Sequence, residues 1–488
     1  MRTWLRRVLR TTLAFALGLT TLAGAAFAGV VVTGRSTHQP VPAFSTGPSS
    51  ASLRYAEPRL AVDPSAVRHG RRLVVAFVVG ASGTVASDLL APYDIFASSP
   101  AFTTYVVADA PTPAPLEGAP AVVPTYTFAH VDADPALRPD LVVVPGLTQP
   151  TGGQEAPLRT WVARQHHDGA KVLGVCSGSL VLAPTGILDG LNATSHWSRI
   201  SALEKSRPAV HWMRGRRYVE DGSVTTTAAV SSGVPAALHL VAELAGPVEA
   251  RRVANLHPEL RWTPTQSTDI PEDHFAAHDW PVGLNYVMPW FRPSVDIALE
   301  SGVGELDATA AFEVYGQSAA AHTVALAEGD TVHTRHGLVL LTTSLTNAPD
   351  VSRVVVPGAG ALDAVDPRLR AWADKRGLTL EPLTARSGPD GAVGGGGFRA
   401  ALQNLADHTD AATTSATAKM IGYPTTDLNL GQQHRSWRPV LLAIAGLALA
   451  VLVALAPASL VRRRRRRRLA GVLTTDSVTE PEIVNVTV

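Results

Sequence analysis

The sequence predicts an α/β protein in which parallel sheets are sandwiched by helices, in two tandem copies, followed by a transmembrane helix. Three observations predict this class. Continuous apolar runs suited to buried parallel strands alternate with helix-like stretches, at 73–79, 105–108, 141–144 and 172–175. A second set of similar landmarks begins after residue 292. An uncharged apolar segment, 439–461, ends against seven consecutive arginines.

Length and composition exclude several classes of protein. The chain has 488 residues, 46% hydrophobic and 17% charged, so it can bury large cores and is not disordered throughout. Its single cysteine, Cys176, excludes an intrachain disulfide and a four-cysteine zinc site. The four arginines of 1–10, the seven of 462–468 and the three acidic residues after them lie at the two ends of the chain. Between these ends, residues 11–461 contain 31 basic and 38 acidic residues, so this part of the chain is acidic. Nucleic acid is therefore not expected as a partner.

Both ends of the chain predict contact with a membrane. Arg6 and Arg7 precede an apolar stretch, 11–32, which contains a signal-like Ala26-Phe27-Ala28, so 1–33 is either a cleaved signal peptide or a membrane anchor. The segment 439–461 is interpreted as a transmembrane helix. Cationic flanks stay in the cytoplasm, which predicts a cell-membrane protein with an extracytoplasmic body and a cytoplasmic tail whose arginines contact lipid headgroups.

Two short segments of the first copy have counterparts in the second copy, in the same order. Asp88–Phe96 matches Asp307–Tyr315 in character, and Val142–Gly146 matches Val354–Gly358. The Asp-to-Gly separations are 58 and 51 residues. The predicted order begins with a signal or anchor (1–33), a linker (34–70), the first copy (71–257) and an aromatic and proline-rich connector (258–291). The second copy (292–423), a linker (424–438), a transmembrane helix (439–461) and a basic tail (462–488) follow. We interpret the connector's aromatic residues as packing elements.

The segment Gly174-Val-Cys176-Ser-Gly178 could carry chemistry. It follows an apolar strand and precedes a helix-like stretch, 180–183. Small residues on both sides of a nucleophile permit a sharp turn that projects its side chain and aims backbone N–H groups at a developing oxyanion. A helix N-terminus is expected to lower the pKa of the thiol. The alternative is an inert buried thiol.

The sequence around this turn resembles the DJ-1/ThiJ/PfpI superfamily, in particular the sensor domains of AraC-type regulators and the isonitrile hydratases. The resemblance is carried by 169–183, Gly186-Ile-Leu-Asp-Gly190 and Ala193-Thr-Ser-His-Trp197, and continues in 221–227 and 236–241. It implies a flavodoxin-like fold for most of 72–257. It is weaker over 295–360.

The resemblance also implies roles for individual residues. Cys176 matches the nucleophile, Asp88 the acid that shares a proton with it, and His196 the histidine near the thiol. The backbone N–H groups of Leu147, which follows Gly146, and of Ser177 would form the anion pocket. Leu147 stands where other members have a second glycine. No cofactor is expected, and no cluster of His, Asp and Glu with metal-ligand spacing stands out in the sequence, so no metal is expected either.

Several alternatives remain open. Asp88 could instead serve as the N-cap of its helix. Asp307 has no cysteine partner, so its presence is explained either by capping or by descent from the same ancestral copy. His257-Pro-Glu259 resembles the His-x-Glu of class I glutamine amidotransferases, although 236–256 reads as a helix. The second copy lacks the cysteine turn, since 386–393 reads Arg-Ser-Gly-Pro-Asp-Gly-Ala-Val, so it is interpreted as a degenerate partner in a pseudo-dimer or homodimer.

Two functions follow from these features. One is a cysteine-dependent hydrolase or hydratase, similar to an amidase or isonitrile hydratase, that acts on a small electrophilic substrate. The other is a non-catalytic module that binds a small molecule or senses oxidants through its thiol.

Overall fold

The structure, a computed structural model, describes the parts of the chain that contain the predicted copies and the connector. The described residues are 16, 18, 20–33, 71–257, 260, 262–290, 292–383, 397–426, 428–430, 440, 441, 443–448, 450 and 451. Thr33–Ser436 is one compact unit, and Met1–Val32 with Trp437–Val488 is the other.

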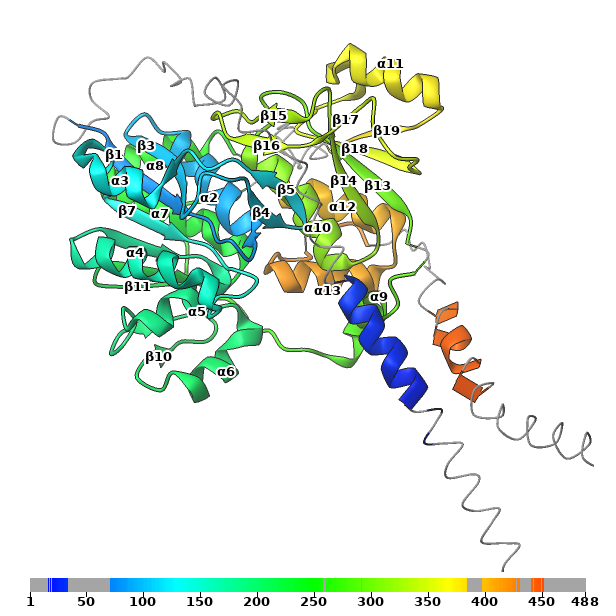
Figure 1. Cartoon of the computed structure of the whole chain (residues 1–488), viewed down its shortest axis with the longest axis horizontal. Coiled ribbons are helices and arrows are strands. Elements are labelled where there is room, and N and C mark those ends of the chain that lie inside the picture. Colours follow the sequence, from blue (N-terminus) through cyan, green and yellow to red (C-terminus); the bar gives the residue numbers. More distant parts are fainter. Residues whose placement is uncertain are drawn as a thin grey trace, which may run out of the picture. The chain divides into compact units, whose positions relative to one another are not determined.

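The first half of the compact body is built on a seven-stranded sheet in the order β11-β12-β8-β7-β1-β3-β6 (Figure 1). All neighbours are parallel except the edge strand β11. The four predicted apolar runs are its central strands, which confirms the α/β prediction. The strands are β1 (Leu73–Val78), β3 (Phe102–Ala108), β6 (Tyr126–Thr127), β7 (Leu141–Val144), β8 (Lys171–Gly174), β11 (Tyr218–Asp221) and β12 (Val224–Thr227).

Helices cover both faces of this sheet because alternate strand residues point to opposite sides. On β1, Val75 and Phe77 belong to a core shared with α2 (Ala86–Ala97) and α7 (Gly233–Leu244). Ala76 and Val78 belong to a second core. Its helices are α3 (Phe128–Ala133), α4 (Ala156–His167) and α5 (Ser179–Leu182).

The single helix expected over 236–256 is wrong. The chain forms α7 and then α8 (Pro247–Ala254), with a break at Gly246, whose φ is 102°. That backbone conformation favours glycine, and Pro247 then begins the next helix at the position where a missing N–H costs nothing.

The second half repeats the strand order of the first. Its parallel sheet runs β17-β14-β13-β18-β19, as β6-β3-β1-β7-β8 does in the larger sheet. The strands are β13 (Ser294–Ala298), β14 (His322–Ala327), β17 (Thr343–Ser344), β18 (Arg353–Pro357) and β19 (Leu380–Leu383). The helices are α10 (Glu305–Ser318), α11 (Pro367–Arg376), α12 (Gly397–His408) and α13 (Ala411–Ile421).

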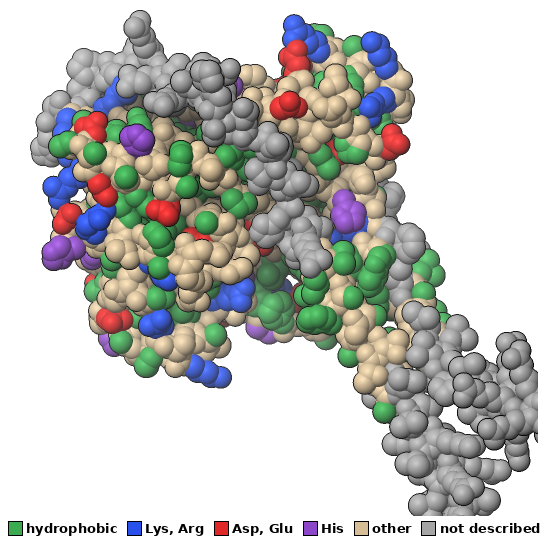
Figure 2. Space-filling model, viewed as in Figure 1, with side chains coloured by type: hydrophobic (Ala, Val, Ile, Leu, Met, Phe, Trp, Pro, Cys, Tyr) green, Lys and Arg blue, Asp and Glu red, His purple; other side chains and the backbone are tan. Residues whose placement is uncertain are grey.

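The face of the body seen in Figure 2 carries charges of both signs. Figure 2 shows acidic and basic side chains interspersed on the visible face, including over α11, whose sequence is Pro-Arg-Leu-Arg-Ala-Trp-Ala-Asp-Lys-Arg.

A third sheet joins the two halves, in the order β15-β16-β5-β4-β2. Its strands are β2 (Thr84–Val85), β4 (Ala114–Glu117), β5 (Ala119–Val122), β15 (Thr331–His333) and β16 (Val339–Leu341). Leu340 of β16 lies opposite Val122 of β5, and the Val123 N–H donates to the Val339 carbonyl at 2.9 Å. Helices α2 and α10 pack against each other (Figure 1). One hydrophobic core contains residues of both halves.

In the described residues, no helix combines the length and the apolar character needed to cross a membrane. Most of the segment expected to do so, 439–461, lies outside those residues, as do all of 34–70 and 462–488.

Candidate functional site

Cys176 lies at the end of β8, where the chain turns sharply. Its φ is 55°, a left-handed conformation that costs free energy in a residue with a Cβ and is often found at functional sites. The Cys176 N–H donates to Thr227 Oγ1 at 2.9 Å, and this bond holds the turn against β12. The side chain is only 5% exposed. The strand and turn predicted from the sequence therefore do place this thiol at the carboxyl end of a parallel strand.

Two glycines allow the turn to lie close to β7. A Cβ on Gly178 would lie 2.1 Å from the Val144 carbonyl oxygen. A Cβ on Gly146 would lie 2.1 Å from Ser177 Oγ and 2.9 Å from Asp88 Oδ2. Both positions are too close for any side chain, so the sequence needs glycine here to bring the thiol, Ser177 and Asp88 together.

Asp88 does not cap its helix. The N-cap of α2 is Val85, and Asp88, three residues later, directs its side chain inward. Its Oδ2 accepts the Gly146 N–H at 2.9 Å, and its Oδ1 has no hydrogen-bond partner among the described residues. The residue is completely buried, and this burial raises its pKa well above the usual value.

Asp307 in the second half is placed in the same way. The N-cap of α10 is Gly304, and Asp307 Oδ1 accepts the Gly397 N–H, the first residue of α12, at 2.9 Å. The capping explanation is thus wrong for both aspartates. Each lies in the first turn of its helix and accepts a backbone N–H from a distant part of its half, Gly146 after β7 or Gly397 of α12.

The expectation of a lowered thiol pKa is wrong. Burial raises the pKa of Cys176 well above its usual value, and the charges of Asp88 and Glu313 raise it further. A hydrogen bond from the Ser177 N–H acts in the opposite direction and is outweighed. The helix that follows, α5, has only four residues. The N–H of Leu147, the other predicted anion donor, has no acceptor among the described residues, and Leu147 lies beside the thiol in the same cavity.

His196 lines that cavity but bonds away from the thiol. Its Nδ1 lies 2.8 Å from Ser198 Oγ, and its side chain caps α6 (Trp197–Ser206). Its Nε2 lies 2.8 Å from the Met420 carbonyl oxygen, which belongs to α13 of the second half. A carbonyl can only accept, so Nε2 carries the proton and Nδ1 accepts. Burial lowers the pKa of this imidazole, in the direction of the neutral form that this bonding pattern describes.

Glu313 of α10 was missed in the sequence. It is buried at the contact with α2, where Ser87 Oγ donates to its Oε2 at 2.6 Å. Burial raises its pKa to about 7, and its charge acts on both Asp88 and Cys176. The matched segments could have indicated it, because Glu313 stands where the first half has Asp94.

The thiol faces a cavity of about 600 Å³ that both halves and the connector enclose. The connector contributes Phe275 and residues of α9 (Trp280–Val287) to this lining, and Phe275 packs against Trp197. The lining is mainly apolar and aromatic, with a few polar and charged groups; it includes Val85, Glu117, Leu147, Trp197, Arg199, Val230, Phe275, Val282, Tyr286, Gln317, Lys419 and Met420.

His257, the alternative catalytic histidine, is not among the described residues that line this cavity. Its Nε2 lies 3.7 Å from Asp94 Oδ1 instead. Glu259, the third member of that proposed triad, lies outside the described residues, as does the segment 386–393.

Comparisons with known proteins place these features in a family. The sequence model of the DJ-1/PfpI family matches residues 74–243. The chain is 30% identical to isonitrile hydratase from Pseudomonas putida over 192 residues, which cover 38% of this chain and 78% of that protein. It is 32% identical to the HTH-type transcriptional regulator CdhR from Pseudomonas aeruginosa over 128 residues, covering 25% of this chain and 38% of the regulator.

Solved structures of similar proteins include a THiJ/PfpI family protein from Pseudomonas syringae, with 29% identity and a TM-score of 0.36 over 43% of this chain and 85% of that one. Another is DJ-1beta from Drosophila melanogaster, with 19% identity and a TM-score of 0.33 over 38% of this chain and 97% of that one.

Proposed function

Since this chain belongs to the DJ-1/PfpI family, we propose that its first half is a cysteine-dependent hydrolase or hydratase for a small electrophilic substrate. The observation that carries the proposal is the conformation of Cys176, which keeps a left-handed backbone while its side chain faces the cavity. Strain of this kind persists only where the surrounding structure imposes it. The similarity to isonitrile hydratase favours an isonitrile as substrate.

The proposed reaction uses the thiol and Asp88 as a pair. Sγ of Cys176 adds to the electrophilic carbon, and the thiol proton passes by way of Asp88 to the substrate. Water then adds to that carbon, the carbon–sulfur bond breaks, and the proton returns to the sulfur. The net change is the addition of one water molecule, which converts an isonitrile to a formamide. The N–H groups of Leu147 and Ser177 would stabilise negative charge that develops beside the carbon.

A non-catalytic binding or sensing module is the second candidate. Its support is the raised pKa of Cys176, which keeps the thiol protonated and weakly nucleophilic, together with the similarity to a transcriptional regulator. In this case the cavity would bind its ligand without covalent chemistry.

The second half and the membrane attachment belong to the same proposal. We propose that the second half is a degenerate copy that forms a pseudo-dimer with the first, which the repeated strand order and the presence of Met420 in the cavity support. We also propose that 439–461 anchors the chain with its body outside the cytoplasm. The support is the uncharged run that ends at seven arginines.

The full chain, Cys176→Ser, Asp88→Asn and the surface control Ser206→Ala should be compared with cyclohexyl isonitrile as the probe. We expect formamide from the wild type and from Ser206→Ala. Cys176→Ser should be inactive, and Asp88→Asn should lose about 100-fold or more in rate, as expected for a lost general acid. Infrared loss of the isonitrile band measures turnover, and alkylation by iodoacetamide measures the thiol.

Formamide production by Cys176→Ser would contradict the enzyme. An inert thiol, together with probe binding that Cys176→Ser leaves unchanged, would favour the binding module.

A further inference from the structure

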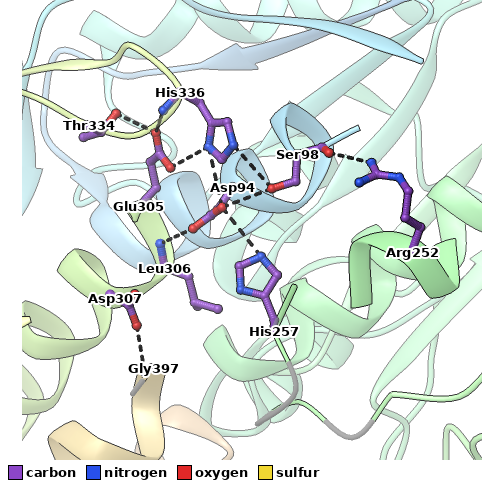
Figure 3. A network of polar contacts seen from close by, with 10 residues as sticks. All are labelled: Asp94, Ser98, Arg252, His257, Glu305, Leu306, Asp307, Thr334, His336 and Gly397. Carbon is purple, nitrogen blue, oxygen red and sulfur yellow. Dashed lines mark hydrogen bonds and ion pairs between the residues drawn. The ribbon is translucent and has the colours of Figure 1, made fainter. Parts of the chain in front are cut away.

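Four polar side chains converge at the contact between α2 and α10, apart from the cysteine cavity (Figure 3). Asp94 comes from α2, His257 follows α8, Glu305 begins α10, and His336 lies between β15 and β16. His336 lies between Glu305 and Asp94, with His257 on the other side of Asp94. Two of these residues belong to each half, so only the folded body can bring them together.

Two of the three distances between these side chains suit a shared ion, and the third, between His336 and Glu305, is that of a direct hydrogen bond. His336 Nδ1 lies 2.8 Å from Glu305 Oε2 and 3.6 Å from Asp94 Oδ1, and His257 Nε2 lies 3.7 Å from the same Oδ1. The ligand atoms of Asp94, Glu305 and His336 all lie within 4.8 Å of one another. Separations of 3.6 and 3.7 Å exceed hydrogen-bond length. Two atoms bound to one tetrahedral zinc ion are about 3.4 Å apart.

The two carboxylates are each fixed by one oxygen and leave the other toward the centre. The Leu306 N–H donates to Asp94 Oδ2 at 2.9 Å. Thr334 Oγ1 and the His336 N–H donate to Glu305 Oε1, at 2.5 and 2.9 Å. Outer hydrogen bonds of this kind orient the ligands in metal sites. Asp94 Oδ1 and Glu305 Oε2 are therefore held in place for a common partner.

His336 is oriented in the same manner. Its Nε2 lies 3.3 Å from Ser98 Oγ, on the side away from the two carboxylates, and its Nδ1 faces them. A metal-bound histidine usually donates its second ring N–H to such an outer partner. Ser98 Oγ also donates a long hydrogen bond, of 3.4 Å, to Asp94 Oδ1.

Charge favours a cation at this point. Asp94 is 1% exposed and Glu305 is completely buried. Two buried carboxylates so close together are costly unless positive charge compensates them. Two imidazoles with two carboxylates suit Zn²⁺, whereas Ca²⁺ and Mg²⁺ prefer oxygen ligands alone.

We propose that Asp94, His257, Glu305 and His336 form a binding site for Zn²⁺ or a similar divalent transition metal that fastens the two halves together. Because the ligands come from both halves, metal binding would stabilise the folded body without taking part in chemistry at Cys176. The competing arrangement is a metal-free ion pair between a protonated His336 and Glu305, which the following experiment distinguishes.

The full chain, with Cys176→Ser to remove the thiol as a ligand, is stripped with a chelator and titrated with Zn²⁺ alone. We expect one Zn²⁺ per chain and a rise in Tm. Asp94→Asn and His336→Gln should each weaken binding by at least about 100-fold, more than the loss of an outer partner costs. The matched control is His333→Gln, an exposed histidine on β15 three residues before His336.

A readout on the unsubstituted site covers the case in which those variants fail to fold. Co²⁺ bound by this set should give the intense visible absorption of a tetrahedral site, and Zn²⁺ should abolish it. The proposal is overturned if the stripped chain takes up no Zn²⁺ in equimolar amount, if Co²⁺ gives no such absorption, or if folded His336→Gln binds Zn²⁺ as tightly as His333→Gln does.

Discussion

At the scale of single residues, Gly178 determines how closely the cysteine turn approaches β7. We expect Gly178→Ala to destabilise the protein by about 3 kcal/mol, because the new methyl group meets the Val144 carbonyl oxygen, a backbone atom that cannot turn away. The turn should also shift, so Cys176 alkylation should change in rate. Urea unfolding of the full chain measures the first effect, and iodoacetamide labelling measures the second.

Gly153→Ala is the matched control, because a Cβ at Gly153 meets nothing within 4 Å. Its free energy of unfolding should stay within about 0.5 kcal/mol of the wild type. Equal stability of the two variants would mean that β7 and the turn are not in the close contact described.

The sequence indicated Cys176 and Asp88 because local pattern and resemblance both mark them. It could not indicate the partners of His196, since Met420 is 224 residues away and only the tertiary fold brings the two together. The same limit applies to the thiol pKa. A helix N-terminus is a local signal, whereas burial and the charge of Glu313, which raise that pKa, depend on a helix of the other half.

At the scale of elements, the α2–α10 contact contains a titrating group whose effect on stability has a definite sign. Burial raises the pKa of Glu313 from 4.5 to about 7, so the folded protein keeps a proton that the unfolded chain releases. This group therefore contributes stability below about pH 4.5, and the contribution is lost as the pH rises toward 7. A shift of this size corresponds to about 3 kcal/mol.

We expect Glu313→Gln to flatten the pH dependence of stability between pH 4.5 and 7, since glutamine imitates the neutral acid. Urea unfolding at several pH values measures it. Glu328→Gln, at a side chain that is 65% exposed, should keep the wild-type profile. A Glu313→Gln profile parallel to that of the wild type would show that Glu313 is not protonated in the fold.

The elements themselves were predictable to different degrees. Buried parallel strands are continuous apolar runs, and β7 was predicted with its observed bounds, Leu141–Val144. The sheet that joins the halves was not predicted. Its strand β2 has two residues and β16 has three, too short for a periodic pattern, and Val122 pairs with Leu340 across more than two hundred positions. The metal cluster was missed for the same reason, since its ligands come from four separate segments.

At the scale of the whole molecule, a shared sheet and a shared core predict that the two halves unfold together. The prediction can be tested at Val355, a completely buried residue of β18. Val355→Ala should cost about 2 kcal/mol, and although it lies in the second half it should expose Cys176 of the first. Thiol labelling in increasing urea should show the Cys176 midpoint falling in step with that of Trp fluorescence.

Lys375→Ala, on the exposed side of α11, serves as the control and should move neither midpoint. If the halves were independent domains, Val355→Ala would lower the fluorescence midpoint and leave the labelling of Cys176 unchanged. The two midpoints shift together only if a loss of stability in the second-half sheet also destabilises the first-half sheet. The contacts through β5, β16, α2 and α10 are the physical route for that transfer, because they bury residues of both halves in one core.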